Sequence, residues 1–96
     1  MNLLEFLLTW ARSLEEWLDT RGIALTFGAS PQDHLRRSVW VTISCPDEES
    51  ELILWESGEA EFACQHADGE IVQEHHEIAN IGELGRLLSC LLMCIN

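Results

Sequence analysis

Cysteine and histidine are the side chains that most often bind zinc in proteins, and this chain has four of each. Cys64 and His66 stand two positions apart, and His75 and His76 are adjacent. A tetrahedral zinc site needs three or four convergent ligands, commonly in short C-x-x-C or H-x-x-x-H spacings. No C-x-x-C pair is present, and Cys90 and Cys94, which have three residues between them, are expected to point into the core from a helix. We therefore expect no metal site, and we interpret these residues as buried thiols and strand histidines beside carboxylates.

The sequence also contains no motif that indicates catalysis without a metal. A Cys64–His75 pair would need a third orienting group and an oxyanion hole, and no motif indicates either. Glu59 and Glu61 could act as acid and base, but two carboxylates at alternate strand positions are more typical of a solvated row. A glycine loop ending in GK[ST] for phosphates is absent. We predict that the protein is not an enzyme and uses no cofactor.

The charge balance points instead toward a protein partner. Seventeen Asp and Glu stand against five Arg and no Lys among 96 residues, which gives a formal net charge of −12. Nucleic acid and anionic membranes would repel such a chain, whereas basic proteins would attract it. Acidity can also serve solubility alone. The length and an apolar content of 47% predict one folded domain over residues 1–96.

The N-terminal apolar run does not have the pattern of a signal peptide. It contains Glu5 and has no basic residue before Arg12. The apolar run at 87–95 is about half the length that a membrane span requires. We therefore expect a cytoplasmic protein with reduced thiols that serve as small buried hydrophobic residues.

Two amphipathic helices are predicted, one near each end of the chain. Residues 3–21 repeat apolar side chains at helical spacing, with Asn2 and Glu5 as a capping box and Gly22 as the stop. Asn80 begins a second helix with Glu83 at the capping-box position. The apolar stripe of this second helix consists of Leu84, Leu87, Leu88, Leu91, Leu92 and Ile95, with Cys90 and Cys94 alongside.

Between the helices, five strands are predicted. The central part of the predicted sheet is 51–77, where three extended runs are separated by Ser57-Gly58 and by Asp68-Gly69. We interpret both pairs as two-residue hairpin loops. The expected strands are 23–27, 39–45, 52–55, 59–66 and 70–76, with a loop at 29–38 and an acidic turn at 45–50. Tight turns make the neighbours antiparallel. The predicted fold is α+β: a five-stranded, mainly antiparallel sheet with the N-terminal and C-terminal helices packed on one face.

The assumed two-residue loops assign each side chain to a face of the sheet. The predicted core face carries Ile53, Trp55, Ala60, Phe62, Cys64 and Ile71. The predicted open face carries Leu52, Leu54, Glu56, Glu59, Glu61, Ala63, Val72, Glu74 and His76. A bulged three-residue loop would shift this assignment, because a slip of one residue exchanges the faces. Trp10, Trp17 and Trp55 are expected in the core, and Trp40 outside it.

An apolar centre within a charged rim is how protein interfaces are commonly built. The candidate partner-binding residues are Trp40, Leu52, Leu54, Glu56, Glu59, Glu61 and Glu74, together with Asp47, Glu48 and Glu49 of the acidic turn. The alternative is that the loop at 29–38 or a second copy of the chain covers this patch.

Three tracts of the sequence resemble one protein family. They are Trp17-Leu18 with Arg21-Gly22, the tract ELILWESGEAEF at 51–62, and His76-Glu77-Ile78 followed by Glu83-Leu84 and Leu87-Leu88. In these tracts the chain is similar to the TriTu-type immunity proteins of bacterial contact-dependent growth inhibition (CdiI-like) and related toxin systems. The resemblance spans most of the chain and carries over no catalytic residues.

The resemblance implies a cytoplasmic antidote that binds the C-terminal nuclease domain of a cognate toxin. It further implies that the toxin is a tRNA-cleaving RNase that works with elongation factor Tu. An acidic protein could occupy the basic groove that such an enzyme presents to phosphates. Two other readings are an acidic secretion chaperone or adaptor acting as a homodimer, and a small metal-dependent enzyme.

Overall fold

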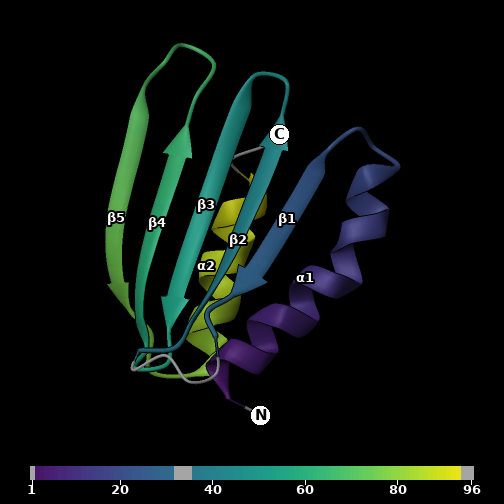
Figure 1. Ribbon diagram of the computed structural model, residues 1–96. Helices are drawn as coiled ribbons and strands as arrows, with labels where there is room; N and C mark the ends of the chain where they lie inside the picture. Colours follow the sequence, from purple (N-terminus) through teal and green to yellow (C-terminus); the bar gives the residue numbers. More distant parts are fainter. Residues whose placement is uncertain (1, 32–35, 94–96) are drawn as a thin grey trace.

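The computed structural model describes residues 2–31 and 36–93. Its elements follow one another as helix, five strands and helix (Figure 1). They are α1 (Leu3–Asp19), β1 (Ala24–Ala29), β2 (Ser38–Cys45), β3 (Glu48–Trp55), β4 (Glu59–Gln65), β5 (Ile71–Glu77) and α2 (Ile81–Met93).

The five strands form one sheet in the order β1-β2-β3-β4-β5, and each neighbouring pair is antiparallel. In Figure 1 helix α2 lies behind the sheet, and helix α1 runs beside β1. Helix α1 packs on β1 and β2, helix α2 packs on β3, and the two helices touch each other. The predicted α+β fold, with an antiparallel sheet and both helices on one face, is confirmed. Neither described helix has the length and apolarity needed to cross a bilayer.

Local capping signals set where the helices begin. The Glu5 N–H donates to Asn2 Oδ1 at 2.8 Å, and the Glu83 N–H donates to Asn80 Oδ1 at 2.9 Å. The Glu83 carboxylate in turn accepts from the Ala79 N–H at 3.0 Å. These contacts satisfy amide groups that a helix leaves without partners at its start. Both predicted caps are therefore confirmed, although α1 ends at Asp19, two residues earlier than expected.

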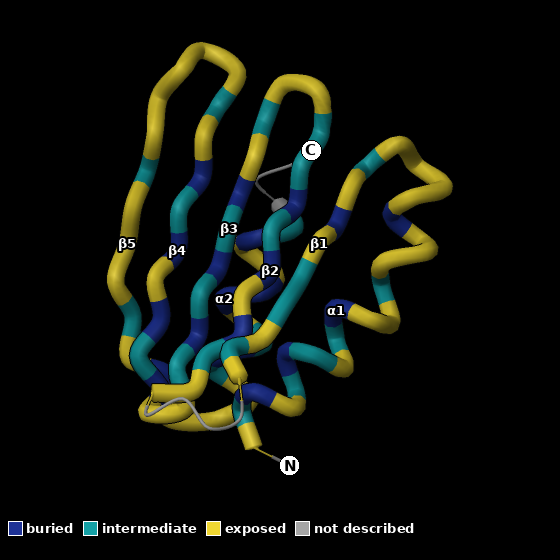
Figure 2. Tube along the Cα trace, in the orientation of Figure 1, coloured by how far each residue is buried: buried dark blue, intermediate teal, exposed yellow. Residues whose placement is uncertain are grey.

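The core lies between the helices and one face of the sheet. Register places Val41 opposite Leu52 and Leu52 opposite Phe62, so a row of apolar side chains runs across three strands. The buried hydrophobic residues of the strands are Leu25, Val39, Val41, Ile43, Leu52, Leu54, Ala60, Phe62 and Cys64. Figure 2 shows this as alternating buried and more exposed positions along the central strands, while β5 at the edge is largely exposed.

The predicted register of two hairpins is wrong, because both loops have three residues. Leu54 pairs with Ala60 around Glu56-Ser57-Gly58, and Gln65 pairs with Ile71 beyond the second loop. In each loop the glycine N–H closes the turn, Gly58 to the Trp55 carbonyl at 2.9 Å and Gly69 to the His66 carbonyl at 2.9 Å. Both glycines have positive φ, 98° and 90°. This is a turn followed by a left-handed bulge residue.

The extra loop residue exchanges the faces of β3 and β5. Leu52 and Leu54, predicted on the open face, are 0% exposed in the core. Ile53 and Trp55, predicted in the core, point away from the helices, as does Ile71, which is 60% exposed. The same shift turns Val72, Glu74 and His76 toward the helix side. The faces of β2 and β4 are as predicted.

Several smaller expectations also need correction. Trp17 is 51% exposed, with the Arg21 guanidinium 3.6 Å from its ring centroid, whereas Trp10 packs partly buried against the core as expected. Cys90 is exposed rather than buried. The predicted acidic turn at 45–50 is mostly strand, because only Pro46 and Asp47 separate β2 from β3. Part of the predicted loop, 32–35, and the predicted helix residues Cys94 and Ile95 lie outside the described residues.

Candidate functional site

The face of the sheet turned away from both helices is the candidate site, and we call it the open face. One row across all five strands defines its centre. Register places Gly28 opposite Trp40, Trp40 opposite Ile53, Ile53 opposite Glu61, and Glu61 opposite His75. The row therefore passes from an aromatic and apolar part over β2 and β3 to a charged part over β4 and β5.

Trp40 contributes an exposed aromatic ring to the open face. Its side chain is 38% exposed, as the sequence predicted. The indole lies over Gly28 on the neighbouring strand, where an added Cβ would stand 2.4 Å from Trp40 Cζ2. Glycine is therefore required there for close approach of the ring to the β1 backbone. The predicted end of the strand at Gly28 is wrong, since β1 continues to Ala29.

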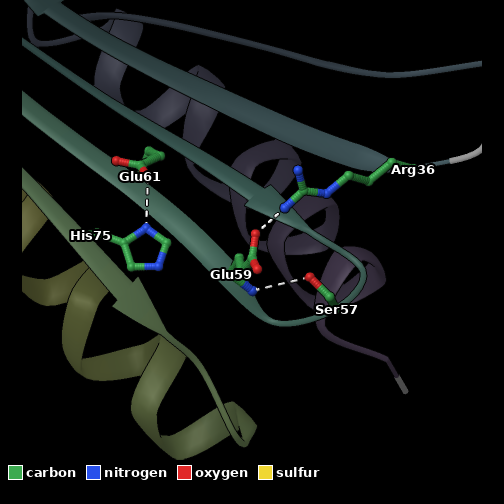
Figure 3. Close-up of polar contacts among 5 residues, drawn as sticks. All are labelled: Arg36, Ser57, Glu59, Glu61 and His75. Carbon is green, nitrogen blue, oxygen red and sulfur yellow. Dashed lines mark hydrogen bonds and ion pairs between the residues drawn. The ribbon is translucent and has the colours of Figure 1, made fainter.

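At one corner of the open face, Arg36 lies between an aromatic ring and a carboxylate. Figure 3 shows its contact with the carboxylate, that of Glu59. The guanidinium carbon of Arg36 is 4.7 Å from the ring centroid of Trp55, and its Nη2 forms an ion pair with Glu59 Oε2. The Glu59 N–H donates to Ser57 Oγ at 3.4 Å. An exposed pair of this kind adds little to stability, but the stacked guanidinium shields part of the Trp55 ring.

Carboxylates surround the aromatic part of the open face. Glu61 Oε1 lies 2.6 Å from His75 Nδ1, and Glu51 Oε2 accepts from Thr42 Oγ1 at 3.3 Å. Beyond the β3–β4 loop, a hollow of about 410 Å³ is lined in part by Glu59, Glu77 and Glu83. Three carboxylates around one hollow suit a cationic side chain.

The pKa of His75 is raised above its ordinary value of 6.5, chiefly by its hydrogen bond to Glu61. Desolvation opposes this rise, while the charges of Glu61, Glu59 and Glu77 add to it. The imidazolium is favoured because its neighbours are carboxylates. When His75 is protonated, part of the negative charge on this face is neutralised.

The residues predicted to bind a partner fall into four groups. Trp40, Glu49, Glu59 and Glu61 all lie on the open face, with Glu49 and Glu59 at opposite ends of it. Asp47 and Glu56 lie exposed in the loops at opposite ends of β3. Glu48 and Glu74 point to the helix side of the sheet, where Glu48 lies beside His66 and Glu74 beside His76. Leu52 and Leu54 are in the core and offer no surface to a partner.

Sequence reasoning missed Ile53, Trp55, Glu51, His75 and Glu77, which the register places on the open face. A usable signal was present in the β2–β3 connection. If Pro46-Asp47 is a two-residue loop, Val41 must face Leu52, and both then share the face of the β-branched residues of β2. Pairing with β2 thus places Leu52 on the core face, whereas a two-residue loop at Ser57-Gly58 would place it on the open face.

Comparison with known proteins assigns the chain to a family. A search of curated proteins finds no match. A family model described as Immunity protein TriTu matches residues 5–94. Members of an immunity-protein family have a cognate toxin as their partner. The match covers both helices and all five strands, and the chain therefore belongs to the TriTu family of immunity proteins.

Proposed function

We propose that this immunity protein neutralises the C-terminal nuclease domain of a contact-dependent growth inhibition toxin by covering its basic substrate cleft with the open face. The observation that carries the proposal is the uncovered sheet of an immunity protein, with Trp40 and Ile53 at its centre and carboxylates around them. Inhibition by occlusion requires no reaction, so the protein acts as a binder and not as an enzyme.

Charge supports a nuclease as the target. A nuclease presents cationic side chains to the phosphates of its substrate. A protein of net charge −12 is attracted to such a surface from a distance, and its carboxylates then compete with nucleic acid for the same groups. Complementary charge raises association rates toward ~10⁸–10⁹ M⁻¹s⁻¹ at low salt. Fast capture suits an antidote, since free toxin acts until it is bound.

Affinity would come from a small apolar centre in addition to charge. Trp40 is exposed and held over Gly28, so docking removes apolar surface from water with little loss of side-chain freedom. The hollow beside Glu59, Glu77 and Glu83 adds a place for an arginine or lysine of the toxin. The acidic residues Asp47 and Glu56 at the two ends of β3 would extend the rim.

The toxin we propose is a tRNA-cleaving RNase that works with elongation factor Tu, and neutralisation would take place in the cytoplasm. The test uses the purified chain and the C-terminal domain of the toxin encoded beside it. We expect a one-to-one complex by calorimetry, binding that weakens as salt increases, and loss of tRNA cleavage in the presence of elongation factor Tu. Absence of a complex at low salt contradicts the proposal. Cleavage of DNA instead of tRNA would retain the occlusion mechanism and correct the substrate.

The alternative, an acidic chaperone or adaptor that works as a homodimer, makes a different prediction for the same surface. In that case a second copy would cover Trp40 and Ile53, and the free chain would sediment as a dimer. A monomer in sedimentation, together with the toxin complex, would rule out the adaptor.

A further inference from the structure

A second cluster of reactive side chains lies on the helix side of the sheet, at the end that carries the β2–β3 and β4–β5 loops (Figure 1). Cys64 and His66 occupy alternate positions of the β4 chain, so they point to the same face. Glu48 begins β3, one position beyond the Glu49–Gln65 pair, and therefore stands opposite His66. Its Oε2 is 3.4 Å from His66 Nδ1. The ligand atoms of all three residues lie within 4.8 Å of one another.

We propose that Glu48, Cys64 and His66 form a binding site for a zinc-like divalent ion. Thiolate, imidazole and carboxylate are the three ligand types that zinc takes from proteins. With bonds of ~2.0–2.3 Å and tetrahedral angles, ligand atoms around zinc stand about 3.3–3.8 Å apart. The Glu48–His66 distance already falls in that range. Rotation of the long Glu48 side chain would bring the remaining atoms close enough.

A buried hydroxyl on the strand next to Cys64 fits a metal-bound thiolate at this position. Ser50 faces Cys64 across β3 and β4 and is 1% exposed. Its Oγ is buried and has no hydrogen-bond partner among the residues that the structure describes, which is costly for a hydroxyl. A metal-bound thiolate is a strong acceptor, and an outer hydroxyl that donates to it would hold the sulfur in place. Metal binding would therefore give an acceptor to a donor that otherwise has none.

The charge of this cluster and its access to solvent also suit the binding of a divalent ion. Thiolate and carboxylate together balance the charge of a divalent ion, and Asp47 and Glu49 on either side of Glu48 make the potential more negative. The Cys64 residue is 2% exposed, whereas the side chains of His66 and Glu48 are 39% and 22% exposed, so an ion has a route from solvent. Three protein ligands leave a fourth position for water or for a ligand from a partner.

Sequence spacing did not predict this site, because Cys64-x-His66 alone supplies two ligands and Glu48 lies 16 positions earlier. Antiparallel pairing supplies the third. The ion would join the start of β3 to the end of β4, close to two loops of the sheet. This inference is independent of toxin binding, since the cluster lies on the opposite face from Trp40.

The test is titration of the full chain with cobalt(II) as a spectroscopic substitute, followed by zinc competition. We expect one ion per chain and a sulfur-to-cobalt charge-transfer band that zinc abolishes. Cys64→Ser should remove the band, while Cys90→Ser, which removes an exposed thiol on α2, should retain it. His66→Gln and Glu48→Gln should each weaken binding at least tenfold, and both positions are exposed enough for the variants to fold.

Stability gives a second measurement. A zinc excess of a hundredfold over Kd should raise Tm by roughly 10 °C or more, and His66→Gln should abolish the rise. The proposal is overturned if the chain takes up no cobalt at micromolar concentration, if the band survives Cys64→Ser, or if His66→Gln and Glu48→Gln bind as the unmodified chain does.

Discussion

Trp40 illustrates how one exposed side chain can be prepared for binding. Its ring rests on Gly28, where no side chain intervenes, and its outer surface faces solvent. The free chain therefore already holds the indole in place, and less conformational entropy is lost when a partner covers it. Trp17 is more exposed, at 51%, but lies on α1 on the far side of the molecule.

This pair of tryptophans allows a matched prediction for toxin binding. We expect Trp40→Ala to weaken toxin affinity by about tenfold or more, because aromatic anchors at the centre of an interface carry much of its energy. Trp17→Ala removes the same kind of side chain and should leave affinity unchanged. Calorimetry with the toxin domain measures both. Equal losses for the two variants would show that the open face is not the contact surface.

His75 has a raised pKa, and its charge changes with pH near neutrality. Its folded pKa is raised, so the stabilising contact with Glu61 is fully present below the ordinary pKa of 6.5 and is lost as the pH rises through the folded pKa. We expect an NMR titration of the imidazole to give a pKa above 6.5, and Glu61→Gln to lower it. Glu74→Gln, on the other face, should leave the His75 pKa unchanged. An unaltered His75 pKa in Glu61→Gln would exclude the contact.

Among the elements, the two bulged hairpin loops decide which side chains of β3 and β5 lie on the open face. Each places a glycine at positive φ, and each adds the residue that exchanges the faces of a strand. They differ in their surroundings. Gly69 is open, whereas a Cβ on Gly58 would stand 2.5 Å from the Ile78 carbonyl oxygen. The Gly58 carbonyl also accepts from the Ile78 N–H at 2.7 Å. The β3–β4 loop is thus tied to the chain between β5 and α2.

Alanine substitutions at these glycines should therefore differ in cost. Gly69→Ala should lower the free energy of unfolding by about 1–2 kcal/mol, the cost of a left-handed residue with a Cβ. Gly58→Ala should lower the free energy of unfolding at least twice as much. Its Cβ would clash with the Ile78 carbonyl, in addition to the cost of the left-handed backbone. Urea denaturation measures both. If the two losses are equal, the contact between the loop and Ile78 does not constrain the fold.

For the whole molecule, the distribution of charge matters as much as its amount. The open face carries Glu49, Glu51, Glu59 and Glu61 on neighbouring strands β3 and β4, and only part of this charge is offset by Arg36 and His75. Other exposed carboxylates, such as Glu15 and Glu16, lie on α1, which runs beside β1 (Figure 1). If the charge of the open face attracts the toxin, a carboxylate on this face should raise the association rate more than a carboxylate elsewhere.

Two double substitutions separate position from net charge. Glu59→Lys with Glu61→Lys should slow association with the toxin by about tenfold or more and reduce its dependence on salt. Glu15→Lys with Glu16→Lys changes the net charge by the same amount and should slow association much less. Stopped-flow measurements at several salt concentrations provide the comparison. Equal effects would mean that overall charge, and not the open face, controls capture.

The elements themselves follow from local sequence. Apolar residues at helical spacing and the caps at Asn2 and Asn80 predict both helices, because these signals act within a few residues of the chain. Alternation and glycine pairs predict the strands and their antiparallel order. The five-stranded sheet, the two helices on one face and the exposure of Trp40 could all be derived in this way.

Which face each side chain occupies depended on contacts between strands. The sequences at Ser57-Gly58 and Asp68-Gly69 are each compatible with a loop of two residues or of three. The loop length shifts the pairing of the two flanking strands by one position. Burying Leu52 beside Val41 and Phe62 settles the choice, since only packing against distant strands distinguishes the two registers. Periodicity along the chain thus specifies secondary structure, whereas the composition of the open face results from pairing between strands.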